Sequence, residues 1–129
     1  MAQKRFVLIA LLMMTPSGAH AQRVIDGSDA AIGAEGTATL LALVGRQLRS
    51  ADAEVAGLHK GRAGAWCGTV DVRNRMGTYT GPRGFAADLA QGFFGRLPEG
   101  PELRSPASMA DFQAMERAKV LFAENCAAR

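Results

Sequence analysis

The two cysteines, Cys67 and Cys126, lie far apart in a chain of 129 residues. In an oxidising compartment an even number of cysteines indicates a disulfide, and two cysteines allow only one intramolecular pairing. That bridge would close a loop of about 60 residues and stabilise the fold by about 4 kcal/mol, because it restricts the unfolded chain. It would also hold the end of the chain against its middle.

The first 21 residues predict export into such a compartment. Lys4 and Arg5 precede nine uninterrupted apolar residues at 6–14, and the small-x-small sequence Ala-His-Ala follows at 19–21. These are the three parts of a cleavable secretory signal. A buried first helix of the folded domain is the alternative, and it leaves the order of these parts unexplained. Nine apolar residues are fewer than the roughly 20 that span a bilayer, so this run is too short for a membrane-spanning helix. We therefore expect a periplasmic or secreted protein, with no transmembrane segment after cleavage.

The charge that remains after cleavage excludes one class of partner. Lys plus Arg falls from 15 to 13 because Lys4 and Arg5 are removed, whereas Asp plus Glu stays at 12. Nucleic-acid binding requires a clustered basic excess. With a net charge of +1 (13 − 12), we expect no nucleic-acid partner.

The rest of the chain divides into a leader and one small domain. Residues 22–36 are rich in Gly, Ala and Asp, which predicts a flexible leader. In 37–49, Leu40, Val44 and Leu48 recur every four residues, which predicts a helix. A short strand is expected at 54–59.

Alternating residues at 65–73, a turn sequence at 74–77 and a returning strand at 77–81 predict a β-hairpin over 65–81. Cys67 then shares a strand face with polar residues, so either a helix covers that face or the strand bulges at Gly68.

Two further helices are expected beyond the hairpin. Phe85, Leu89 and Phe93 recur every four residues, which predicts a short helix over 85–94, and a loop follows at 95–106. Ser108 is expected to cap a helix over 108–124. The expected fold over 37–129 is α+β: a small antiparallel hairpin or sheet packed against two or three helices, with one disulfide. The expected core is Leu40, Val44, Leu48, Trp66, Val70, Tyr79, Phe85, Leu89, Phe112, Met115 and Phe122.

No residue set in the mature chain predicts catalysis, a metal site or a cofactor. His59 is the only histidine after cleavage, and a Cys-His nucleophile with Cys67 competes with the disulfide that Cys67 is expected to form. One His and two distant Cys do not make a metal site. Basic residues around the hairpin are a candidate anion-binding patch, with an ordinary solvated face as the alternative. They are Lys60, Arg62, Arg73, Arg75 and Arg83.

The segment CGTVDVRNRMGTYTGPRGF at 67–85 resembles a motif of small exported proteobacterial proteins of uncharacterised function. That motif is C-G-x-V-N-A-K-N-x-x-G-x-Y-x-G-x-x-x-F. Asp71, Val72 and Arg73 depart from it. The resemblance supports export and an α+β domain, and it implies no activity. The matching positions are Cys67, Gly68, Val70, Asn74, Gly77, Tyr79, Gly81 and Phe85.

These observations favour an exported, non-catalytic binding or accessory protein of the bacterial envelope. The expected partner is an envelope protein or an anionic wall component. Two alternatives remain: a small secreted hydrolase or thiol enzyme that uses His59, and a structural envelope component.

The export hypothesis predicts the mass of the protein recovered from its host. We expect the intact mass of a chain that starts at Gln22, and no thiol alkylation until a reductant is added. Mass spectrometry with and without reduction measures both. A full-length mass with two alkylated thiols would contradict both the signal and the disulfide.

Overall fold

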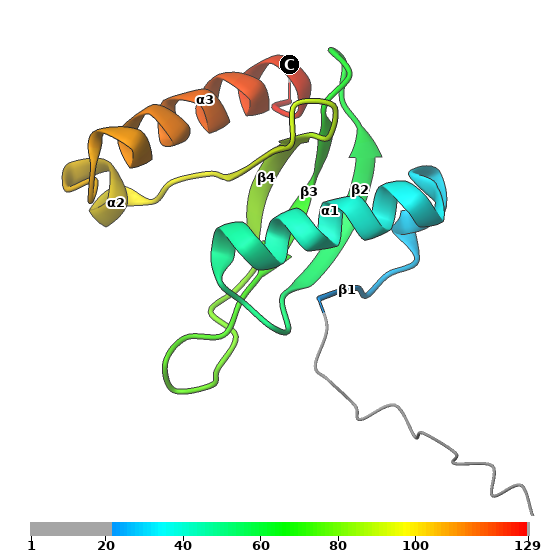
Figure 1. Cartoon of the computed structure of the whole chain (residues 1–129), viewed down its shortest axis with the longest axis horizontal. Coiled ribbons are helices and arrows are strands. Elements are labelled where there is room, and N and C mark those ends of the chain that lie inside the picture. The colour runs from blue at the N-terminus through cyan, green and yellow to red at the C-terminus, as the bar shows by residue number, and fades with distance from the viewer. Residues whose placement is uncertain (1–21, 129) are drawn as a thin grey trace, which may run out of the picture.

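The computed structural model describes residues 22–128, so the expected signal lies outside the described residues. In this range a five-stranded mixed sheet combines with three α-helices and one short 3-10 helix, which confirms the α+β class. The strands pair in chain order from β1 to β5, and Figure 1 labels the first four of them. β1 runs parallel to β2, and all other neighbours are antiparallel. The strands are β1 (Arg23–Val24), β2 (Glu54–Lys60), β3 (Trp66–Asp71), β4 (Arg83–Asp88) and β5 (Phe93–Arg96).

One face of the sheet carries the main apolar core. Side chains alternate between the two faces of a strand, so Val70, Phe85 and Phe94 point to the same side. There they pack beneath α1 (Gly33–Leu48), and the rings of Phe85 and Phe94 lie 4.9 Å apart. The buried cluster comprises Leu40, Leu43, Val44, Ala53, Val55, Leu58, Val70, Phe85, Ala87 and Phe94.

The opposite face of the sheet is covered by α3 (Met109–Asn125), which approaches closely because the strands carry small residues there. A β-carbon on Gly95 would lie 2.5 Å from the methyl of Ala118, and one on Gly84 would lie 2.9 Å from the Phe122 ring. The two long helices therefore lie on opposite sides of the sheet (Figure 1).

The C-terminal end of α3 is bonded to the segment that leads into β3. Cys67 and Cys126 form the predicted disulfide, with their Cα atoms 5.7 Å apart. The side-chain oxygen of Asn125, which is buried, accepts hydrogen bonds from the amides of Ala63 (2.8 Å) and Ala65 (3.1 Å). The face that carries Cys67 is thus covered by a helix. The irregularity in pairing lies in β2, between Ala56 and His59, rather than at Gly68.

The helix expected over 85–94 is wrong. Those residues form β4, a turn, and β5, and β4 is the strand that pairs with β3 in place of the expected 77–81. The four-residue spacing of Phe85, Leu89 and Phe93 misled because Leu89 lies at the turn, where Gly92 has a φ of 62°. Two strands joined by a turn can thus give the same four-residue spacing of apolar residues as a helix.

The 77–81 segment does return antiparallel, but it pairs only with 72–74 just beyond β3, where the amide of Thr80 donates to the carbonyl of Val72. The amide of Gly77 donates to the carbonyl of Asn74, which confirms the turn, and Arg73 and Tyr79 form an isolated bridge. The strand expected at 54–59 is confirmed as β2.

The remaining differences concern the leader and the core. Residues 22–36 contain β1, the 3-10 helix η1 (Ser28–Ala31) and the first turn of α1, which begins at Gly33 instead of Thr37. Helix α3 and its Ser108 cap are confirmed, since the Ser108 hydroxyl accepts from the amide of Asp111. Phe112 was wrongly placed in the core: it is 43% exposed, because the first turns of α3 extend past the strands. The loop at 95–106 contains the short helix α2 (Gly100–Arg104).

The disulfide should account for much of the stability of this domain. We expect the double variant Cys67→Ala/Cys126→Ala to lose about 4 kcal/mol of unfolding free energy, because about 60 residues of loop are released in the unfolded chain. Urea unfolding followed by the fluorescence of Trp66 measures this loss. Reduced wild-type protein is the control and should match the variant. A loss below about 1 kcal/mol would contradict the loop-closure argument.

Candidate functional site

The five basic residues considered as a binding patch do not form one surface. One group lies at the C-terminal end of β2, beside Trp66, and the other lies at the end of β3 that carries Asp71. Lys60 pairs with Trp66 and Arg83 pairs with Val70, so the nearest members of the two groups are four residues apart along β3, or roughly 13 Å at about 3.3 Å per residue. The first group is Lys60 and Arg62, and the second is Arg73, Arg75 and Arg83.

Three of these basic residues make bonds within the fold. Arg62 donates to the carbonyls of Ala127 (2.7 Å) and Ala123 (3.1 Å) at the end of α3. Arg73 pairs with Asp52 at 2.8 Å and lies over the Tyr79 ring. Lys60 and Arg75 are exposed.

Arg83 has a structural role beside β5. Its side chain is only 14% exposed, and its guanidinium contacts Glu99 (3.2 Å) and Glu102 (3.1 Å). It also donates to the carbonyl of Leu97. These bonds fix α2 and the segment before it against the sheet, so Arg83 positions part of the groove described below.

The Cys-His pair considered for thiol chemistry lacks its thiol. His59 and Cys67 are register partners on β2 and β3, but the sulfur of Cys67 is bonded to Cys126. His59 is exposed, and its Nδ1 lies 2.9 Å from the carbonyl oxygen of Gly57. In residues 22–128 no three His, Cys, Asp or Glu side chains gather as a metal ion would require. Within the same range, no helix has the length and apolar character needed to cross a membrane.

The residues that carry the motif resemblance build the fold. Gly68 leaves no room for a side chain, since a β-carbon there would lie 2.9 Å from the Phe85 ring. The Asn74 carboxamide accepts from the amides of Met76 and Thr78 and closes the turn. The Tyr79 hydroxyl donates to the carbonyl of Asp52. Cys67 forms the disulfide, Val70 and Phe85 are core residues, and Gly77 and Gly81 have positive φ.

The departures from that motif also have structural explanations. Asp71 accepts a hydrogen bond from the amide of Gly81 at 3.0 Å, Val72 packs against the core, and Arg73 pairs with Asp52. β3 lies in the middle of the sheet and is paired on both sides. The motif strand is therefore not an open binding edge.

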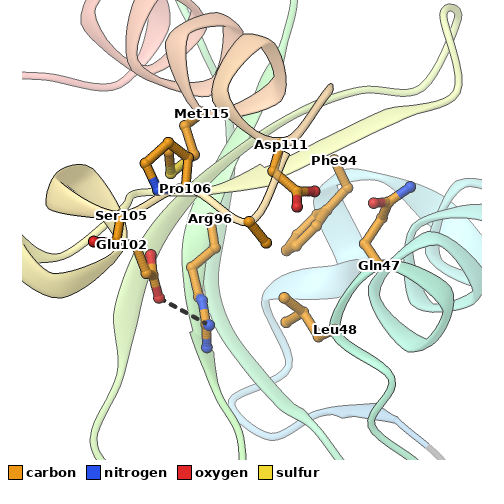
Figure 2. A pocket seen from close by; sticks show the side chains of 10 residues that line it. Gln47, Leu48, Phe94, Arg96, Glu102, Ser105, Pro106, Asp111 and Met115 are labelled. Carbon is orange, nitrogen blue, oxygen red and sulfur yellow. Dashed lines mark ion pairs between the residues drawn. The ribbon is translucent and has the colours of Figure 1, made fainter. Parts of the chain in front are cut away.

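A pocket of ≈ 360 Å³ lies beside β5, which is an edge strand of the sheet. Figure 2 shows Leu48 and Gln47 of α1 on one side of Phe94, with Asp111 and Met115 of α3 across from them. We call this pocket the β5 groove. Its lining residues are Gln47, Leu48, Phe94, Arg96, Glu102, Ser105, Pro106, Ala107, Asp111 and Met115.

The β5 groove combines an apolar floor with a charged rim. Leu48, Phe94 and Met115 supply the apolar part. At one end, Arg96 lies 3.7 Å from Glu102, and its side chain is 22% exposed. Burial, together with the nearby charge of Arg83, lowers the pKa of Arg96 from its usual range. An apolar pocket with a few polar groups is typical of ligand sites.

The sequence prediction missed this site. Phe94 was assigned to a helix and Arg96 to a loop, so neither was expected to line a groove. The signal that would have found β5 is Gly92 at a turn, followed by the alternation of Phe94 and Arg96 around Gly95.

No family model matches this chain, and neither a curated protein nor a solved structure matches it. The functional argument therefore depends on the geometry of the groove.

The ion pairs beside the groove should make stability depend on acidic pH. The pKa of Glu102 is lowered, chiefly because Arg83 donates a hydrogen bond to its carboxylate. The stabilisation is complete above about pH 4.3, the ordinary value of an unfolded glutamate, and is lost as pH falls through the lower pKa of the folded state. We expect Glu102→Gln to lack this part of the acid sensitivity. The effect is about 1 kcal/mol or less, because the carboxylate is partly exposed. Urea unfolding at pH 7 and pH 3 measures it, and parallel losses in both proteins would contradict the prediction.

Proposed function

We propose that this chain is an exported binding module of the bacterial envelope, periplasmic or secreted, that binds its ligand in the β5 groove and has no catalytic role. The disulfide fits an oxidising compartment. The expected signal at 1–21 supplies the route to that compartment.

The observation that carries the proposal is the position of the groove between α1, β5 and α3, each of which is attached elsewhere in the fold. α1 is anchored by the core, β5 by its pairing with β4, and α3 by the disulfide at its end. A site whose walls are already in place loses little conformational entropy when a ligand binds. Apolar and charged groups also lie close together there, which allows both affinity and orientation.

The enzyme alternative receives less support from the geometry. His59 is the only histidine in the mature sequence, and it lies on β2, with β3 and β4 between it and β5. It does not line the β5 groove. If His59 were a catalytic base, His59→Ala would abolish the function, and under our proposal that variant keeps ligand binding.

One observation favours the structural-component alternative as a second candidate. Met109 and Phe112 are exposed apolar residues that lie together at the start of α3, and Leu103 of α2 is also exposed. Exposed apolar side chains that lie together are typical of protein contacts. A structural component would self-associate through them, which sedimentation over a range of protein concentrations would reveal.

Ala107→Trp tests the groove as the working site. Ala107 is exposed and lines the pocket, so an indole there should fill the groove without disturbing the core. We expect at least one ligand from a panel of peptides, muropeptides, oligosaccharides and phospholipid head groups to raise the melting temperature of the wild type, and Ala107→Trp to remove that response.

Ala110→Trp is the matched control. It introduces the same side chain three residues away, at an exposed position of α3 outside the groove lining. It should respond to the ligand as the wild type does. If Ala107→Trp also keeps the full response, the ligand binds elsewhere and the proposed site is wrong.

A further inference from the structure

We propose that the ligand of the β5 groove is an extended polypeptide segment that pairs with β5 as an additional strand. This inference rests on the proposed function and adds the chemical class of the ligand. It follows from the register of the sheet, from the capping of the opposite edge at β1, and from the shape and charge of the groove.

The register shows which backbone groups of β5 point outward. The amide of Leu97 donates to the carbonyl of Gly84, next to the pairs Phe85–Arg96 and Ala87–Phe94. In an antiparallel pair, hydrogen-bonded and non-hydrogen-bonded positions alternate, so the amides and carbonyls of Phe94 and Arg96 point away from β4. Among residues 22–128 no hydrogen bond from another element reaches these four groups. They are the donors and acceptors that an added strand would use.

The opposite edge of the sheet, at β1, is closed to pairing with another strand. β1 is only two residues long, and beyond it the Asp26 carboxylate accepts from the amide of Gly57 (2.8 Å). The Ser28 hydroxyl accepts from the next amide, that of Leu58 (3.0 Å). Short strands and side-chain caps are the usual means of preventing edge pairing. The β5 edge has an open pocket beside it instead.

The walls of the groove favour a single strand over a second copy of this protein. Figure 2 shows α1 residues on one side of Phe94 and α3 residues on the other. A second copy that paired through its own β5 would bring its own α1 and α3 into the same space. A single extended chain brings no such layers, and alternate side chains would enter the pocket beside Leu48, Phe94 and Met115.

The charge of the groove favours a basic segment. Arg96 and Glu102 lie close to one another, and Arg83 is neutralised by Glu99 and Glu102. Asp111 lines the groove and takes part in no ion pair within residues 22–128. Its carboxylate is therefore the charge available to a ligand, and a Lys or Arg side chain complements it.

A blocked hexapeptide of alternating valine and lysine is the probe. We expect it to bind the mature protein, to slow hydrogen exchange at the amides of Phe94 and Arg96, and to bind about fivefold more tightly than the valine–glutamate hexapeptide. Asp111→Asn should remove most of that preference. Two N-methylated versions of the peptide test the pairing directly. Only alternate amides of an added strand face its neighbour, so methylation of one alternate set should abolish binding and methylation of the other should spare it.

A pair of protein variants tests the same bonds from the other side. The amide of Arg96 points outward, and proline is tolerated at such edge positions. We expect Arg96→Pro to bind the peptide about tenfold more weakly than Arg96→Ala, because it lacks one further hydrogen-bond donor. Arg96→Ala is the matched control, since both variants lack the guanidinium.

Three results would overturn the inference. If both N-methylated peptides bind like the parent, backbone pairing is not the mode of recognition. Suppose that the valine–lysine peptide leaves both amides unprotected, while a ligand of another class stabilises the wild type and not Ala107→Trp. The groove is then a binding site, but not for an added strand. If the free protein is a dimer in sedimentation with both amides already protected, a second copy occupies the edge. If Ala107→Trp removes the stabilisation by no ligand at all, it is the proposed function that fails.

Discussion

The Asn125 carboxamide and the neighbouring disulfide determine how α3 lies on the sheet. Asn125 satisfies two amides of the loop before β3, and Cys126 is bonded to β3 itself. A buried amide without an acceptor costs about 1–3 kcal/mol of folding free energy. The conformation of the loop therefore depends on the end of α3. Because α3 is one continuous helix of 17 residues, this attachment also affects where its N-terminal half lies beside β5.

Arg83 is the second constraint on the same region. It extends from β4 to Glu99 and Glu102 and so joins the sheet to the segment that precedes α3. Basic residues that seemed in the sequence to be available for a partner are thus used to hold elements together. The residues that line the groove were expected in separate helices and in the loop at 95–106, and only the tertiary structure brings them together.

The sequence was informative where a local pattern has one structural meaning. The alternation in 65–73, the turn chemistry of Asn74 and Gly77, the Ser108 cap and the pairing of Cys67 with Cys126 all correspond to what is observed. It failed at 85–94, where a spacing of four arises from two short strands and a turn. It also failed at Phe112, because the length of α3 relative to the sheet depends on tertiary structure. The groove could not be predicted, since its parts come from four separate elements.

The position of α3, which forms one wall of the groove, depends on two glycines of the sheet. Gly95 and Gly84 allow Ala118 and Phe122 to rest almost on the backbone of the sheet, while the disulfide holds the far end of the helix. An added methyl at Gly95 would lie 2.5 Å from the methyl of Ala118, so it would push α3 away from the sheet and displace the half of the helix that carries Asp111 and Met115. The shape of the β5 groove thus depends on a residue on the covered side of the sheet that does not itself line the groove.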